Sequence, residues 1–101
     1  MRHATGELPT ELEPYREAIL SIGEKHGATR VGLFGSFANG TANSASDVDL
    51  WVETAPGVTL FDLAAMRVEL TLLLGRPVDL LTLGGLDGAD RDALITETVM
   101  L

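Results

Sequence analysis

Short β-rich runs alternate with longer helical segments along this chain, and glycine or proline separates most of them. The runs at 29–34, 48–52 and 77–83 are rich in Val, Leu and Thr, which is typical of strands. Helical spacing of apolar residues favours helices at 10–26, 60–74 and 89–99, with a short one starting at 36–38. The resulting order, αβ(α)βαβα, predicts an α/β (α+β) fold in which helices cover a small mixed β-sheet.

Length and charge narrow the class of protein further. The 101 residues predict a single domain over 1–101, and the absence of Cys excludes disulfides and thiolate metal sites. A formal net charge of −8 opposes stable binding to nucleic acid, whose phosphates require clustered cations. No uncharged apolar run is long enough for a membrane span, so we expect no membrane contact and a cytoplasmic location.

Acidic residues interrupt two of the predicted strands. Asp47 and Asp49 are two residues apart, so an extended strand places both carboxylates on one face, where they could bind one cation. A solvated strand face is the simpler explanation, but Val48, Leu50 and Val52 indicate a largely buried strand.

Two other sequence features are ambiguous alone and are interpreted together with Asp47 and Asp49. Asp79 is a lone acid inside the apolar run PVDLLTL, where it either faces water at a sheet edge or requires a buried partner. Gly35-Ser36 directly follows a strand and either forms an ordinary turn or lets a phosphate approach the backbone. Taken together, the three carboxylates predict a site for one or two Mg²⁺ ions that would also bind substrate phosphates.

The stretch GSFANGTANSASDVDL (35–50) resembles the signature of the polymerase β-like nucleotidyltransferase superfamily, and LGRPVDL (74–80) resembles the segment carrying its third Asp. The short chain is similar to the minimal nucleotidyltransferase branch, whose members are often encoded beside HEPN-domain proteins as toxin–antitoxin pairs. This resemblance implies that Asp47 and Asp49 bind Mg²⁺, that Asp79 binds metal and helps activate the attacking hydroxyl, and that Gly35 and Ser36 hold a nucleoside triphosphate. It also implies transfer of AMP from ATP to a tyrosine of a HEPN ribonuclease toxin, with this chain as the antitoxin. The family commonly has Arg where this sequence has Asn39.

Two alternatives remain open. The chain could be a non-catalytic antitoxin that neutralises its partner by stoichiometric contact, or it could modify a hydroxyl of a small molecule. Trp51, on the same strand face as Asp49, is expected to pack against the helix after Gly35 or to contact a base.

The predicted helix 60–74 has a second apolar stripe, formed by Phe61, Ala65, Val68 and Leu72, in addition to the one needed for the core. This stripe predicts a surface for a partner or for self-association through the Leu60–Leu74 helix.

Overall fold

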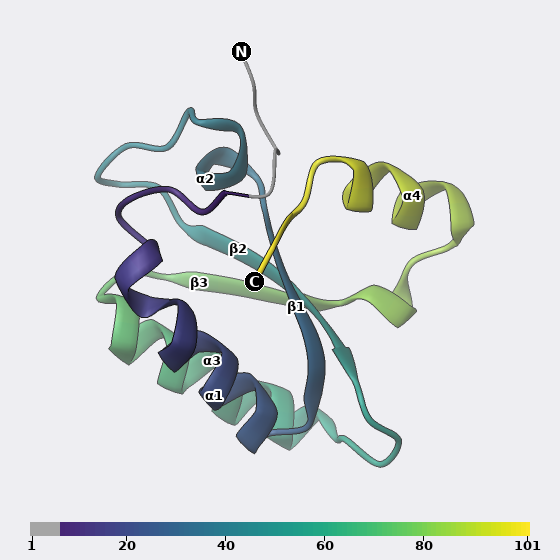
Figure 1. Cartoon of the computed structure of the whole chain (residues 1–101). Coiled ribbons are helices and arrows are strands. Elements are labelled where there is room, and N and C mark those ends of the chain that lie inside the picture. Colours follow the sequence, from purple (N-terminus) through teal and green to yellow (C-terminus); the bar gives the residue numbers. More distant parts are fainter. Residues whose placement is uncertain (1–6) are drawn as a thin grey trace.

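The computed structural model describes residues 7–101, which contain a four-stranded mixed sheet in the order β3-β2-β1-β4 (Figure 1). The strands are β1 (Ala28–Phe34), β2 (Val48–Thr54), β3 (Val78–Thr82) and β4 (Val99–Met100). β1 pairs antiparallel with both β2 and β4, whereas β2 and β3 are parallel. The predicted fold class, a small mixed sheet covered by helices, is confirmed.

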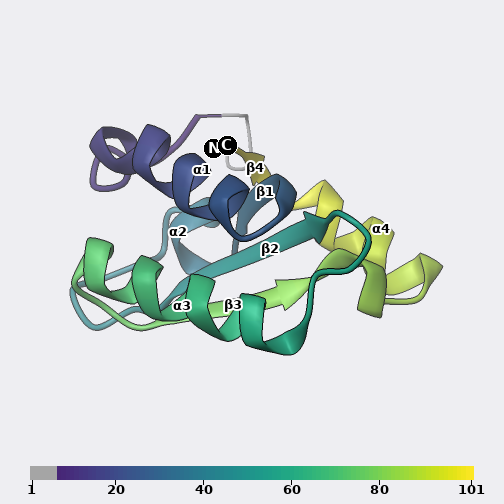
Figure 2. The ribbon, with the colours of Figure 1, turned by 90° about the horizontal axis from the view of Figure 1, so that it is seen from below.

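Two helices cover one face of this sheet. α1 (Arg16–Lys25) packs against β1, α3 (Leu60–Leu74) packs against β3, and the two helices contact each other (Figure 2). The buried side chains of this layer form the main hydrophobic core, which includes Ile19, Val31, Leu33, Val48, Leu50, Val52, Met66, Leu70 and Val78. Figure 1 shows α4 (Gly88–Thr96) apart from both of these helices.

Local chemistry explains where α3 begins and ends. The Thr59 side chain accepts a hydrogen bond from the Asp62 backbone N–H, and the Asp62 carboxylate accepts one from the Thr59 backbone N–H. This reciprocal pair is a capping box, which satisfies amides that the first helical turn cannot. Gly75 ends the helix in the left-handed region at φ 71°.

Two predicted helix boundaries are wrong. The first helix was expected from Thr10, but the α-helix begins at Arg16 after a 3₁₀ turn over Glu13–Tyr15. Pro14 explains the delay, because proline disfavours α conformation at the preceding residue and has no N–H to donate. The last helix was expected to reach Val99, but α4 ends at Thr96, and Val99 pairs with Leu33 of β1.

Among residues 7–101, no helix combines the length and the apolar character needed to cross a lipid bilayer.

Candidate active site

Three chain segments meet at one end of the sheet. β1 ends opposite the start of β2, with Phe34 paired to Asp49, and β3 starts beside β2, with Asp79 paired to Asp49. A short helix, α2 (Ser36–Asn39), follows β1 at this end. The topology thus gathers the three sequence motifs, although they are separated along the chain.

Asp49 and Asp79 form the centre of the site. They are register partners on adjacent parallel strands, so their side chains leave the same face of the sheet. Both belong to the face opposite α1 and α3, because Val48 and Leu50, which flank Asp49 in β2, are buried in the core and Asp79 is the register partner of Asp49. Asp49 is partly buried and Asp79 is exposed. The exposed position of Asp79, one of the two expectations from the sequence, is therefore the one observed, and its carboxyl still has a close partner.

The charge state of Asp49 reflects this crowding. Its pKa is raised above the ordinary value, first by burial, then by the negative charges of Asp79 and Asp47, and last by a hydrogen bond with the Asp79 side chain. Like charges this close oppose ionisation of the pair. A bound cation would reverse the effect, because it stabilises the ionised carboxylates.

Asp47 stands slightly apart from this pair. It precedes β2 and is exposed, yet its charge contributes to the raised pKa of Asp49. Among residues 7–101, no three His, Cys, Asp or Glu side chains are gathered into a ready-made metal-binding group. The structure therefore brings two of the expected ligands together and leaves the third within electrostatic range.

The donor set fits Mg²⁺ in its chemistry. Carboxylate oxygens are the ligands this ion prefers, and it commonly takes only one or two from the protein while retaining water and substrate phosphate oxygens. Asp49 and Asp79 can supply these ligands as they stand, and Asp47 is the candidate for a third.

Gly35 allows the strand end to approach the carboxylates. Its φ of 75° lies in the left-handed region, and a Cβ at this position would overlap Oδ2 of Asp49. Any side chain at Gly35 would therefore strain the backbone and displace Asp49. Ser36, the first residue of α2, is partly exposed at the same end of the sheet.

Arg76 is a site neighbour that the sequence motifs did not reveal. Its Nη1 donates to the carbonyl oxygens of Ser46 at 3.1 Å and Asn43 at 3.3 Å, and its guanidinium lies over the Phe37 ring, 4.9 Å from the centroid. It therefore ties α2 and the loop before Asp47 to the start of β3. The only sequence signal was a basic residue directly before the third predicted strand, 77–83, which contains Asp79.

Asn39, which stands where the family commonly has Arg, has a local role. Its Oδ1 accepts hydrogen bonds from the backbone N–H of Thr41 at 3.1 Å and from the Thr41 hydroxyl at 2.6 Å. The side chain thus stabilises the turn after α2. Arg76 supplies a cation close to this turn, although it comes from a different part of the chain.

Burial of Trp51 leaves no exposed ring surface for a base, so the base contact, one of the two sequence expectations for this residue, is wrong. The indole is fully buried, and its Nε1 donates to the Thr98 hydroxyl at 2.7 Å. Arg30 covers the ring at 5.4 Å from the centroid and also pairs with Glu53. Trp51 therefore joins the sheet to the segment before β4.

The chain is similar in sequence to known proteins. The family described as "Nucleotidyltransferase domain" matches residues 15–99. The "Putative protein adenylyltransferase" of Methanocaldococcus jannaschii is 36% identical over 83% of this chain and 90% of its own length.

Solved structures agree with the fold. One described as a "putative minimal nucleotidyltransferase" is 42% identical and superimposes with a TM-score of 0.82 over 89% of this chain and 92% of the other. The crystal structure of a toxin–antitoxin complex with AMP-PNP shares the fold at a TM-score of 0.73 and 21% identity, over 91% of this chain and 72% of the other.

Proposed function

The chain belongs to the nucleotidyltransferase domain family, and we propose that it transfers AMP from ATP to a hydroxyl group of a partner protein. The observation that carries this proposal is the pairing of Asp49 with Asp79 on adjacent strands, beside Gly35, whose lack of a side chain leaves room for the Asp49 carboxylate. The named activity of the M. jannaschii relative supports adenylyl transfer to protein, since this chain covers 90% of that relative.

The reaction divides among residues already described. Mg²⁺, when bound, would neutralise the triphosphate and lower the pKa of the attacking hydroxyl. Asp49 and Asp79 would hold the ion, and Asp47 would complete the ligand set. Gly35 and Ser36 position the triphosphate at the end of β1.

Bond making and bond breaking follow from this arrangement. The acceptor oxygen forms a bond to the α-phosphorus of ATP while the bond from that phosphorus to the bridging oxygen breaks, which releases pyrophosphate. The hydroxyl proton passes to Asp79, the exposed carboxylate of the pair. The product is an AMP ester of the acceptor.

The acceptor that we propose is a HEPN-domain toxin, which makes this chain an antitoxin. The sequence resemblance to minimal nucleotidyltransferases supports this partner, and the fold shared with a toxin–antitoxin complex is compatible with it. The need for ATP and Mg²⁺ agrees with the cytoplasmic location expected from the sequence.

Label transfer tests the proposal directly. The chain, Mg²⁺ and α-³²P ATP are incubated with a lysate that contains the products of the neighbouring genes, and a parallel sample receives γ-³²P ATP. Adenylylation labels a protein from α-³²P ATP alone, whereas phosphorylation labels it from γ-³²P ATP alone. The mass of the labelled band identifies the acceptor.

Matched variants connect the label to the site. Asp49→Asn and Asp79→Asn should each abolish the band. Asp92→Asn, on the exposed surface of α4, makes the same chemical change elsewhere and should leave it unchanged. If a stable complex with the partner forms without any transfer of label, the non-catalytic antitoxin becomes the better explanation.

A further inference from the structure

One side of α3 is apolar and faces away from the core. Phe61 is 87% exposed, Leu72 78% and Val68 53%, and the small Ala65 between them is also exposed. Leu60, at the start of the helix, is 82% exposed. On the opposite side, Met66 and Leu70 are fully buried, so the helix already fills its place in the core. We call the outward set Phe61, Ala65, Val68 and Leu72 the α3 stripe.

The spacing of the α3 stripe is that of a helix seam. Its members follow one another at intervals of four, three and four residues, the heptad pattern by which two helices pack. This series reads the same in both directions. Two antiparallel copies can therefore place Phe61 of each against Leu72 of the other, and Ala65 of each against Val68 of the other. A surface that complements itself in this way is what a two-fold dimer requires.

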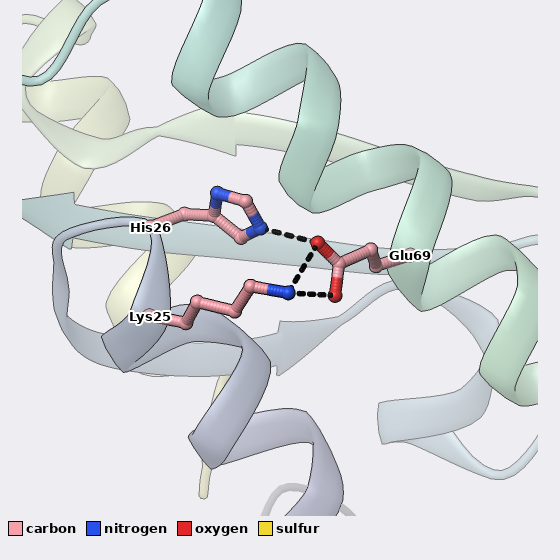
Figure 3. A network of polar contacts seen from close by, with 3 residues as sticks. All are labelled: Lys25, His26 and Glu69. Carbon is pink, nitrogen blue, oxygen red and sulfur yellow. Dashed lines mark hydrogen bonds and ion pairs between the residues drawn. The ribbon is translucent and has the colours of Figure 1, made fainter.

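The two acidic groups of α3 do not oppose this packing. The Glu69 carboxylate is bound within its own chain by Lys25 Nζ at 3.0 Å and by His26 Nε2 at 2.6 Å (Figure 3). The Asp62 carboxylate is engaged in the capping box with Thr59. Pairing of the stripes therefore removes no carboxylate from its existing partners, and desolvation of unpaired acids does not add to its cost.

The α3 stripe supplies most of the apolar area of a small specific dimer. Its exposed side chains, mainly Phe61, Val68 and Leu72, present roughly 400 Å² of apolar surface per copy. Two copies would bury about 800 Å² from these side chains, and burial of the surrounding rim raises the total toward the size of the smaller stable interfaces, about 1,200 Å².

We propose that this protein forms a homodimer in which α3 packs antiparallel against α3 of a second copy. Because α3 covers the sheet face opposite Asp49 and Asp79, the dimer leaves both carboxylate sites open. Each particle then offers two sites to partner proteins, and a dimeric partner would be held more tightly than a single site could hold it.

Mass measurement over a range of concentrations tests the dimer. Sedimentation equilibrium from about 1 to 200 μM, a range that covers micromolar dissociation constants, should show the mass rising from that of the 10.7 kDa chain to twice that value. Since each copy carries a net charge of −8, more salt should strengthen the association. A wild-type chain that stays monomeric at about 200 μM and high salt overturns the proposal.

Point variants locate the interface. Leu72→Glu and Phe61→Glu change side chains that are already exposed, so the fold, checked by circular dichroism, should persist while the dimer is lost. Ile95→Glu, at a 41% exposed position on α4, is the matched control and should remain dimeric. A dimer that survives Leu72→Glu contradicts the α3 interface. If the wild-type chain stays monomeric and binds a different protein through α3, the α3 stripe belongs to that partner and self-association is overturned.

Cross-linking determines the direction of the helices. The chain has no Cys, so single cysteines can be introduced without background. A mixture of Ala65→Cys and Val68→Cys chains should form a disulfide-linked dimer faster than Ala65→Cys chains alone, because the antiparallel pairing places position 65 opposite position 68. Faster linkage in the Ala65→Cys sample indicates parallel helices and refutes the proposed geometry.

Discussion

Replacement of Gly32 by alanine should destabilise the protein through a single contact. Gly32 lies opposite Trp51 in the β1–β2 pairing, and an added Cβ would overlap three atoms of the indole, Cε2, Cζ2 and Nε1. Its backbone is not in the left-handed region, so alanine meets no conformational barrier there. Any loss of stability therefore measures the packing of Trp51 on the sheet.

The size of the effect follows from three contributions. Overpacking of a fully buried side chain costs about 2 kcal/mol. Displacement of the indole weakens the hydrogen bond from Trp51 to Thr98, which contributes about 1 kcal/mol. The lower entropy of the unfolded alanine chain offsets about 0.5 kcal/mol of this loss. The net decrease in the free energy of unfolding should be about 2.5 kcal/mol, or about 12 °C in Tm for a domain of this size.

The chain contains its own probe for this experiment. Trp51 is the only Trp and is fully buried, so its fluorescence reports urea unfolding directly. The midpoint of Gly32→Ala should fall by roughly 2 M urea at an unchanged slope. Gly84→Ala is the control, because nothing lies within 4 Å of a Cβ there and its φ is not positive.

A double-mutant cycle then isolates the contact. In a Trp51→Leu background, followed by circular dichroism, Gly32→Ala should cost less than about 1 kcal/mol because the obstructing ring is gone. A free energy of unfolding for Gly32→Ala within about 0.5 kcal/mol of the wild-type value would refute the reasoning, as would an equal loss in both backgrounds.

Three further predictions concern the site and the α1–α3 contact. Asp49→Asn should reduce label transfer by at least about 100-fold, while the urea midpoint in metal-free buffer stays the same or rises, because a like-charge repulsion is removed. Arg76→Ala should slow transfer while the circular dichroism spectrum is unchanged, and Arg76→Lys should not restore the rate, since an ammonium cannot reproduce the planar fork that bonds two carbonyl oxygens. Contacts with His26 and then Lys25 lower the pKa of Glu69. The stabilisation of the folded state by the Glu69 carboxylate should therefore be complete above the ordinary Glu pKa of about 4.3, and it should be lost as the pH falls through the lowered pKa. The Tm difference between wild type and Glu69→Gln should accordingly be present at about pH 6 and shrink toward about pH 2.5, and a constant difference would contradict this role.

Local patterns were sufficient for the elements whose ends depend on their own residues. The bounds 60–74 expected for α3 from apolar spacing are correct, and the capping box of Thr59 and Asp62 and the stop at Gly75 act within one helical turn of these ends. The alternation around Val48 and Leu50 correctly predicted β2 and the face that carries Asp49. The apolar stripe on the outer side of α3 was also visible in the sequence, and its members are exposed in the structure.

The features that the sequence did not predict depend on residues far apart in the chain, except for the late start of α1, which Pro14 explains. Val99 fits the end of a helix by its spacing, but hydrogen bonds to the open edge of β1 hold it in a strand. Trp51 was placed on the correct face, yet its position is set by Thr98 and Gly32, neither of which is near it in the chain. Arg76 reaches back to the loop at Ser46, a contact that no spacing rule predicts.

The residues that supply the chemistry of this protein could be identified from the sequence alone: two acidic residues flanking Val48, a third inside the apolar run at 77–83, and a glycine at the end of a strand. These properties depend on residue type and on spacing along the chain, which do not require tertiary contacts. The tertiary structure decided that Asp79 lies beside Asp49, that Asp47 remains exposed, and that the carboxylates and the α3 stripe are on opposite sides of the sheet. Strand order and register arise from hydrogen bonds and packing between residues far apart in the chain, so only the folded molecule specifies them.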